Sequence, residues 1–300
     1  MIKENKTSAI CFGEILWDFL PSGPKPGGAP LNVAYHLNKL GVNSSIVSRI
    51  GNDPDGNKLM NLVNHWGINP AFLQSDQTQP TGHVIASLKN GNEVSYEIKS
   101  PVAWDFMVND DKLNATINTD TYLVYGSLAA RNQVSRATLY NLLESDGVKV
   151  FDINVRPPFI NKVLFETLLS KADIVKFNQA ELELVQLMFR GSFGQESEQV
   201  RFIQDKFMIS NVIVTKGEFG ASYYTENEQY NTSGREITVR DTVGSGDAFL
   251  ASFIANHQKG LNPQIIIDLA AQMGAFVASK EGGCPDYNMD EFLNFSTNTF

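Results

Sequence analysis

The sequence predicts an α/β fold, with helices packed against a mostly parallel sheet. Two observations predict it. Short apolar runs alternate with segments whose apolar residues recur at helical spacing along most of the 300 residues, as in βαβ units. A hairpin pattern near residue 90 interrupts this alternation and adds antiparallel strands. With 42% hydrophobic and 19% charged residues, the chain has enough apolar side chains for a large core.

The first two βα units lie in the N-terminal part of the chain. Residues 8–13 are an apolar strand, and a loop rich in Pro and Gly follows at residues 21–28. Residues 30–40 repeat apolar side chains at helical spacing before Gly41, which ends the helix. A strand at residues 45–50 and a helix over residues 59–66 complete the second unit.

Residues 81–98 break the alternation. Two runs at residues 83–88 and 93–98 flank Lys89-Asn90-Gly91-Asn92, and Asn-Gly between such runs is typical of a hairpin turn. The hairpin forms either a flap with its own small sheet or an addition to the edge of the main sheet.

The alternation then resumes. Strands are expected at residues 122–125, 148–153, 174–177 and 212–215, and helices at residues 135–143, 163–169, 180–188 and 199–207. Residues 190–198 are polar and predict a loop. Residues 223–226 and 237–239 are expected to form a late antiparallel pair, with helices at residues 249–255 and 263–279.

Composition excludes several classes of partner. The net charge of −9 and the pI near 5.0 argue against nucleic acid or an anionic membrane as the main partner, although a local backbone nest can still bind an anionic substrate. No run of about 18 apolar residues is present, so we expect no membrane span. The first 19 residues lack a long apolar core, so we expect no signal peptide.

The cysteines and histidines show no metal-ligand spacing. Cys11 and Cys284 are far apart and are expected to be free thiols in a reducing cytosol. We therefore expect a cytoplasmic protein. Of the four histidines, His36, His65 and His257 lie in helical runs and are predicted to be surface or partly packed residues, whereas the fourth, His83, lies in a hairpin strand.

The most informative motif covers residues 241–249, DTVGSGDAF, between a strand-like run at residues 235–240 and an apolar helix. Gly244 and Gly246 let the backbone approach a ligand, and the unpaired N–H groups of the helix start form an anion site. The carboxylate of Asp247 would repel a phosphate, so it makes sense as a base acting on the group that attacks the phosphate. The alternative is a plain capped helix.

A second motif, GGAPLNVA at residues 27–34, is followed by Leu40-Gly41 and by IGNDPDG at residues 50–56. Together with DTVGSGDAF, it resembles the two signatures of the ribokinase-like (PfkB) carbohydrate kinases, and GGAPLNVA is most similar to the fructokinase-type branch. The resemblance covers nearly the whole chain. It implies a three-layer αβα fold in one domain, residues 1–300, with a small β lid built from insertions at about residues 14–28 and 81–107.

The resemblance also implies the catalytic and nucleotide-binding residues. Asp247 corresponds to the family's catalytic base, and Gly244, Ser245 and Gly246 correspond to its anion hole. ATP and Mg²⁺ are the implied cofactors. The implied nucleotide contacts are Asn178, Thr215, Gly217, Gly244 and Gly246, and Glu181 would hold Mg²⁺ through water. On residues alone, Asn178 and Glu181 could instead be a capping box.

The implied sugar contacts come from three segments, and they are Asp18, Gly27, Gly28, Asn32, Asp152, Asn154 and Arg156. The last three form a D-x-N-x-R run at the end of a strand, where open α/β sheets bind ligands. Alternatively, Asp152 and Asn154 only begin a turn, Arg156 is a surface residue, Asp18 is a turn residue and Asn32 is an ordinary polar residue of the first helical turn.

Two implied features depend on details of the chain. Asp241 and the Val243 carbonyl are suitable K⁺ ligands, but Asp286 stands where a serine is expected, so K⁺ activation stays open. The lid implies a homodimer that pairs lid to lid.

The expected function is ATP-dependent phosphorylation of a sugar hydroxyl, with D-fructose as the first substrate and with 2-keto-3-deoxygluconate, another sugar or a nucleoside as alternatives. No GxxxxGK[ST] motif is present. Two other classes are weighed against a kinase. If the protein were a dinucleotide-dependent oxidoreductase, Gly244-x-Gly246-x-x-Phe249 would be a GxGxxG dinucleotide-binding fingerprint that has lost its third glycine. A non-catalytic sugar or nucleotide sensor would gain nothing from Asp247.

Overall fold

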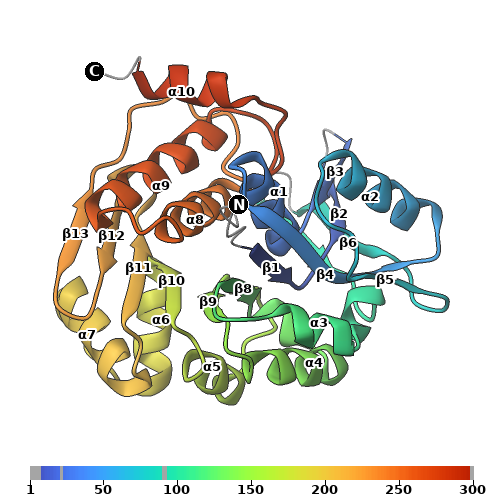
Figure 1. Ribbon diagram of the computed structural model, residues 1–300, viewed down its shortest axis with the longest axis horizontal. Helices are drawn as coiled ribbons and strands as arrows, with labels where there is room; N and C mark the ends of the chain where they lie inside the picture. Colours follow the sequence, from blue (N-terminus) through green and yellow to red (C-terminus); the bar gives the residue numbers. More distant parts are fainter. Residues whose placement is uncertain (1–7, 21–22, 90–92, 298–300) are drawn as a thin grey trace, which may run out of the picture.

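A computed structural model describes residues 8–20, 23–89 and 93–297 of the chain (Figure 1). The predicted turn residues 90–92 and the first seven residues of the segment considered as a signal peptide lie outside these ranges. A nine-stranded sheet crosses the molecule in the order β13-β12-β11-β10-β9-β8-β1-β4-β5. Its strands are β1 (Ser8–Phe12), β4 (Asn43–Gly51), β5 (Leu73–Asp76), β8 (Thr121–Gly126), β9 (Val148–Asp152), β10 (Ile174–Asn178), β11 (Asn211–Thr215), β12 (Ala221–Tyr224) and β13 (Gln229–Thr232).

The order of the strands places a topological switch point between β1 and β8. From β1 the chain moves through β4 to β5 on one side, and from β8 it moves through β9, β10 and β11 on the other. All of these neighbours pair in parallel, and only β11–β12 and β12–β13 are antiparallel. Ligands of open α/β sheets bind at the carboxyl ends of the strands beside such a point.

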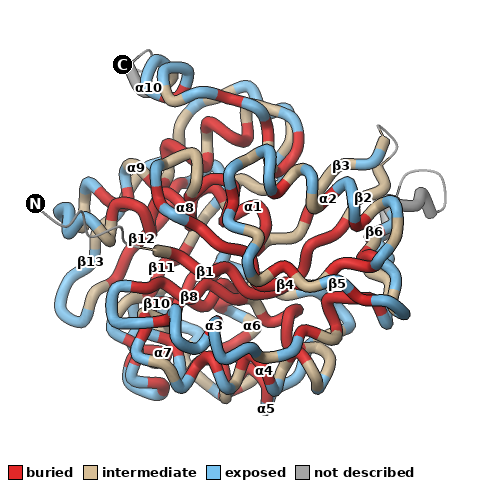
Figure 2. The backbone as a smooth tube through the Cα atoms, turned by 45° about the vertical axis from the view of Figure 1, so that its right-hand side comes forward, coloured by how far each residue is buried: buried red, intermediate tan, exposed pale blue. Residues whose placement is uncertain are grey.

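Strand alternation distributes the core to both faces of the sheet. In β1, Ala9 and Cys11 pack into one core cluster and Ile10 and Phe12 into the other. Helices α1 (Ala29–Lys39), α2 (Pro54–His65), α8 (Ser245–His257), α9 (Pro263–Ala278) and α10 (Met289–Thr297) cover the first face. Helices α3 (Asp111–Thr116), α4 (Gln133–Leu143), α5 (Lys162–Leu169), α6 (Gln179–Phe189) and α7 (Glu196–Phe207) cover the second. Buried backbone runs through the centre of the molecule between these two layers (Figure 2).

A second sheet of four strands stands beside the main one, in the order β3-β2-β6-β7. It contains β2 (Leu16–Leu20), β3 (Gly23–Gly27), β6 (Gly82–Lys89) and β7 (Glu93–Ile98). The hairpin therefore belongs to a small separate sheet and does not extend the main sheet. Residues 23–27 are a strand where the sequence predicted a loop, because their backbone pairs with β2 and their Pro and Gly residues occupy an edge.

The late antiparallel pair was predicted with the wrong partner. The second strand of the pair is β13, and residues 237–239 are not a strand. Residues 233–240 instead return along the end of α9, where the N–H groups of Arg240 and Asp241 donate to the Ala278 carbonyl. Val239 alternates like a strand residue but is 57% exposed, because no strand lies beside it.

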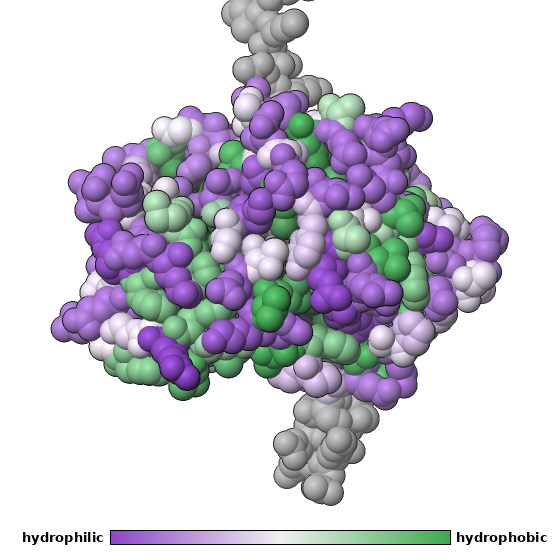
Figure 3. Space-filling view, turned by 90° about the horizontal axis from the view of Figure 1, so that it is seen from below, coloured by the Kyte–Doolittle hydropathy of each residue, from purple (hydrophilic) through white to green (hydrophobic). Residues whose placement is uncertain are grey.

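The short elements that were not predicted include β2, β5, α3 and α10, and α7 begins inside the predicted loop at residues 190–198. None of the helices in the described ranges is long and apolar enough to span a membrane. The surface seen from below the view of Figure 1 is mostly hydrophilic, with hydrophobic residues in separate patches (Figure 3), as is ordinary for a folded domain.

Candidate active site

The motif at residues 241–249 forms the start of α8 and the turn before it. Gly244 adopts a left-handed conformation with φ 75 and begins the helix without a side-chain cap. The N–H groups of Gly246 and Asp247 therefore have no intrahelical partner and lie at the positive end of the helix dipole. A side chain at Gly244 would collide with the backbone of Gly283, so only glycine fits this turn.

Asp247 lies in the first turn of α8, where its carboxylate is half-buried. Its Oδ2 accepts a hydrogen bond of 2.8 Å from Asn32 Nδ2, so two of the predicted site residues meet although they are 215 positions apart. Burial and the nearby negative charge of Asp152 raise the pKa of Asp247 to about 6, while Asn32, Lys176 and Arg156 act in the opposite direction. Such a carboxylate is ionised at neutral pH and can still accept a proton.

A cavity of about 570 Å³ opens beside this turn. Its lining includes the predicted nucleotide contacts Thr215, Gly217 and Gly246, together with Ser245. Apolar side chains of Phe219, Val239, Phe249, Ala271 and Ala275 line the part of the cavity formed by α8, α9 and the loop after β11. The cavity is large enough for a nucleotide-sized ligand whose anionic end would reach the start of α8.

A buried lysine, which sequence reasoning missed, lies under the turn. Lys176 Nζ donates to both carboxylate oxygens of Asp152 at 2.9 Å, and a Cβ on Gly246 would be 3.5 Å from the same Nζ. Three nearby carboxylates, of which Asp152 acts most strongly, raise the pKa of Lys176 against the effect of its burial. A lysine inside the apolar run at residues 174–177 is the signal that could have found it.

Asn178 and Glu181 form a capping box at the start of α6, as the alternative interpretation predicted. Asn178 Oδ1 accepts from the Glu181 N–H at 2.9 Å, and Glu181 Oε2 accepts from the Asn178 N–H at 2.8 Å. Glu181 Oε1 also accepts from the Val155 N–H. Burial and then the charge of Asp152 raise the pKa of Glu181. The carboxylates of Asp152 and Glu181 therefore interact beside the turn.

Of the predicted sugar contacts, Asn32 bonds Asp247 directly, whereas Asp18 and Gly27 lie in the small second sheet and Gly28 lies just before α1. Gly27 pairs with β2, and a side chain on it would occupy the place of the Asp18 carboxylate. Burial raises the pKa of Asp18 to about 6. Gly28 precedes α1 with φ 109, and a Cβ there would collide with the backbone of Glu14. Gly27 therefore serves close packing within the small second sheet, and Gly28 serves the close approach of the start of α1 to the segment before β2.

The D-x-N-x-R run follows β9 at the same edge of the sheet. Asn154 is held at φ 39, an unusual backbone conformation for a residue other than glycine. Arg156 is exposed, and its guanidinium is close enough to lower the pKa of Glu14, Asp18 and Asp247. The structure thus brings Arg156 over a group of carboxylates that come from three segments.

Glu14 is a second residue that sequence reasoning missed. It follows β1 at the switch point and is 4% exposed, and burial raises its pKa to about 7. Its Oε2 is buried without a hydrogen-bond partner among the described residues. A carboxylate directly after a buried strand that ends in glycine was the available signal.

The predicted K⁺ ligand Asp241 and the departure at Asp286 lie in different surroundings. Asp241 accepts from the Val243 N–H at 3.0 Å and from the Gly282 N–H at 2.9 Å, so it joins the turn before α8 to the loop after α9. Asp286 is fully exposed and pairs with Lys39 at 3.5 Å, so its carboxylate does not enter this site.

This site agrees with one family of enzymes. Residues 23–288 match the family described as pfkB family carbohydrate kinase. The chain belongs to the pfkB family. Among curated relatives, this pfkB protein is 25% identical to the fructokinase of Escherichia coli, over 90% of this chain and 92% of that one. It is 28% identical to the fructokinase of Vibrio alginolyticus with the same coverage.

Solved structures of fructokinases share the fold. The fructokinase of Vibrio cholerae O395, in a form bound to fructose, ADP and calcium, superposes with a TM-score of 0.82 at 24% identity, covering 97% of this chain and 99% of that one. The ATP-bound fructokinase of Xylella fastidiosa gives 0.84 at 20% identity, covering 97% and 98%. At these identities the likeness shows the fold: a mostly parallel main sheet with a small second sheet.

Proposed function

We propose that this protein transfers the γ-phosphoryl group of ATP to a hydroxyl of a sugar, with D-fructose as the first substrate. The observation that carries the proposal is the position of Asp247. Its carboxylate lies in the first turn of a helix without a side-chain cap, directly after Ser245 and Gly246, which line the cavity, and it accepts a hydrogen bond from Asn32. A base beside a nucleotide-sized cavity and a polar side chain suited to a sugar is what phosphoryl transfer to an alcohol requires.

The chemistry then follows from the geometry. Asp18, Asn32 and the Gly27-Gly28 backbone orient the sugar, and Asp247 takes the proton of the attacking hydroxyl. The oxygen attacks the γ-phosphorus in line, its bond to phosphorus forms as the bond to the β-phosphate oxygen breaks, and ADP leaves. In this proposal the N–H groups of Gly246 and Asp247 face the charge that develops on the transferred group, whereas the Ser245 N–H donates to the Thr242 carbonyl. Lys176 lies below Gly246 and adds a fixed positive charge.

The residues present fit a divalent cation. Burial first, and then repulsion from Asp152, raise the pKa of Glu181 even beside Lys176. Glu181, through water, with Asp152 beside it, would hold Mg²⁺, which neutralises phosphate charge when bound. A K⁺ site would use Asp241 and the Val243 carbonyl without Asp286. Potassium appears in a ligand-bound form of the Vibrio cholerae fructokinase.

The choice of fructose rests on two supports. Curated relatives of bacterial and plant origin are named fructokinases. In addition, the charge of Arg156 lowers the pKa values of Glu14, Asp18 and Asp247, so these carboxylates offset part of its charge. This arrangement favours a neutral sugar. The second candidate is 2-keto-3-deoxygluconate, whose carboxylate could pair with the exposed guanidinium of Arg156.

We further propose that residues 1–300 act as one catalytic domain with lid insertions at about residues 14–28 and 81–107, that two lids pair in a homodimer, and that the two free thiols suit the cytoplasm. Sugar and ATP are the proposed partners, with no nucleic acid or membrane, given the net charge of −9.

A coupled assay of ADP formation with fructose, other hexoses, pentoses, keto-acids and nucleosides tests the function. We expect fructose to give the highest kcat/KM, and NMR of the product will identify the phosphorylated hydroxyl. Turnover highest with 2-keto-3-deoxygluconate would replace the substrate. No ADP formation above that of the Asp247→Ala variant with any acceptor would refute the kinase.

A further inference from the structure

One face of α1 is bonded to the loop after α9. Four side chains at helical spacing reach residues 283–287, and we call this set of contacts the α1 clamp. Cys284 Sγ donates to Asn32 Oδ1 at 3.2 Å, Tyr35 donates to the Pro285 carbonyl at 2.6 Å, His36 bonds Gly283 and Tyr287, and Lys39 donates to the Tyr287 carbonyl at 2.9 Å.

His36 is the most buried member of the clamp, although the sequence predicted a surface or partly packed residue. It is 0% exposed because the loop that covers it comes from residues about 250 positions away. Its Nε2 lies 2.9 Å from the Gly283 carbonyl, which can only accept, so Nε2 carries the proton. Its Nδ1 then accepts from the Tyr287 hydroxyl at 2.9 Å.

Gly283 also lies directly against the turn before α8. A Cβ on Gly244 would lie 2.8 Å from the Gly283 oxygen, so the two backbones touch without side chains between them. A Cβ on Gly283 would lie 2.7 Å from Asn32 Nδ2, the same nitrogen that donates to Asp247. His36, Gly283 and Gly244 thus form one continuous path from α1 to the turn that holds Asp247.

We propose that His36 is a positioning residue for phosphoryl transfer: by holding the Gly283 carbonyl, it keeps the turn at residues 244–247 in register with Asn32 on α1. The proposal rests on the proposed function for its catalytic consequence. Its structural part, the link between His36 and the turn, stands on the contacts alone. Misplacing a catalytic group by about 1 Å costs on the order of 100-fold in rate.

The test compares two polar replacements that differ in which histidine nitrogen they imitate. His36→Gln places an amide N–H near the Nε2 position and can still donate to Gly283, whereas His36→Asn reaches only the Nδ1 position near Tyr287. We expect His36→Gln to retain kcat within about threefold and His36→Asn to lose roughly 10-fold to 100-fold, with the KM for sugar little changed. His36→Leu should behave like His36→Asn.

His257→Leu is the matched control. It also removes a histidine–tyrosine bond, of 2.7 Å to Tyr122, but at the far end of α8. We expect it to lower the melting temperature without lowering kcat. Equal kcat for His36→Gln and His36→Asn, or an equal loss in His257→Leu, would overturn the proposal.

Amide hydrogen exchange separates this proposal from the proposed function. His36→Asn should speed exchange in residues 241–248 as well as in residues 280–288, and His36→Gln should not. If the wild type phosphorylates no acceptor, the proposed function fails while exchange still tests the link. Faster exchange confined to residues 280–288 would show that His36 holds only its own loop and would overturn the inference.

Discussion

Asp247 has a pKa of about 6 because burial and Asp152 disfavour its charge. A base must be ionised to act, so we expect kcat/KM for the sugar to be constant above about pH 7 and to fall tenfold per pH unit below about pH 6. Asp247→Ala should cut kcat by at least about 100-fold while ATP binding survives. Steady-state kinetics across pH, with calorimetric ATP titration, measure both effects. Near-wild-type turnover of the variant would remove Asp247 from its role.

Asn32 binds two groups at once, because its amide donates to Asp247 and accepts from Cys284. We expect Asn32→Ala to raise the KM for the sugar far more than the KM for ATP. Loss of its hydrogen bond should also move the acid limb of the pH profile upward by roughly one unit, because that bond stabilises the charged form of Asp247. Equal changes in the two KM values would exclude Asn32 from the sugar pocket.

Lys176 neutralises Asp152 below the anion-binding turn. Lys176→Met should lower kcat at least about 10-fold and destabilise the protein by about 3–5 kcal/mol, because Asp152 keeps a buried charge without a partner. The rate should be measured at pH 8, where Asp247 stays ionised even if its pKa rises. Full recovery of kcat at pH 8 would mean that Lys176 acts only through the pKa of Asp247.

Residues of the site differ in how far sequence could predict them. Asp247 and Asn32 lie in local motifs. In both motifs, glycines that give the backbone extra freedom precede a helix start, and this pattern can be recognised in the sequence itself. For Lys176 and Glu14 the local signs are weaker, a lysine inside an apolar run and a carboxylate directly after a buried strand, and His36 has none. Their importance comes from partners that arrive from other strands and loops, which only the tertiary structure brings near.

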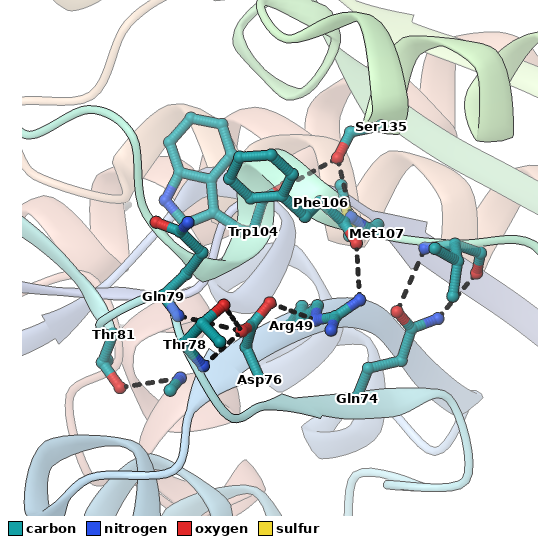
Figure 4. A network of polar contacts seen from close by, with 12 residues as sticks. Arg49, Gln74, Asp76, Thr78, Gln79, Thr81, Trp104, Phe106, Met107 and Ser135 are labelled. Carbon is teal, nitrogen blue, oxygen red and sulfur yellow. Dashed lines mark hydrogen bonds and ion pairs between the residues drawn. The ribbon is translucent and has the colours of Figure 1, made fainter.

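At the scale of elements, polar contacts join the main sheet to the two segments that flank the hairpin of the lid (Figure 4). Arg49 pairs with Asp76 at 2.8 Å and donates to the Phe106 carbonyl, so one side chain joins β4 to both segments that flank the hairpin. The Asp53 carboxylate caps α2 through the Gly56 N–H and also accepts from the backbone and hydroxyl of Thr81, just before β6.

Asp53→Ala should therefore cost about 2 kcal/mol of folding free energy and raise the sugar KM, because a cap and the lid anchor are lost together. Hydrogen bonds from Thr81 and Gly56 outweigh the opposing effect of burial and lower the pKa of Asp53. Its contribution is thus present at neutral pH and is lost as the pH falls below about 4. Denaturant unfolding at several pH values measures it.

Asp110→Ala is the control for this prediction, because Asp110 caps α3 through the Lys112 N–H, a local bond on an exposed part of the chain. It should cost about 1 kcal/mol and leave the sugar KM unchanged. The same rise in KM in both variants would show that the loss of stability, and not the lid anchor, is responsible.

Elements were predictable where a periodic apolar pattern coincides with burial, as in β10 and α9, whose bounds agree with the predicted ranges. Prediction failed for β3, whose Pro and Gly residues look like a loop, and for residues 237–239, which look like a strand but have no neighbour. Strand formation depends on a pairing partner, and the partner is not local in the sequence.

At the scale of the whole molecule, one face of the small second sheet carries both a predicted sugar contact and an exposed aromatic residue. Asp18 pairs with Val84 and Val84 with Ile98, so these three side chains share that face, and Tyr96 lies on it two residues before Ile98. Tyr96 is 63% exposed although it is aromatic. Such a side chain on a lid is suited to a subunit interface.

We expect light scattering after gel filtration to give a dimer of the 33.2 kDa chain, and Tyr96→Glu to shift it toward the monomer. Met208→Glu is the control, because Met208 is 85% exposed at the end of α7, away from the lid sheet. A monomeric wild type, or a dimer that resists Tyr96→Glu, would contradict pairing through this face.

The sequence by itself determined the α/β class, the order of most core elements and the glycine-flanked turn that carries Asp247, because periodicity and backbone freedom are local properties of a chain. Only the tertiary structure decided that the lid has its own sheet and that Lys176 and Glu14 enter the site. It also decided that α1 is hydrogen-bonded to the loop beside Gly244. These features arise from pairing and burial between segments distant in sequence, which no single stretch of the chain encodes.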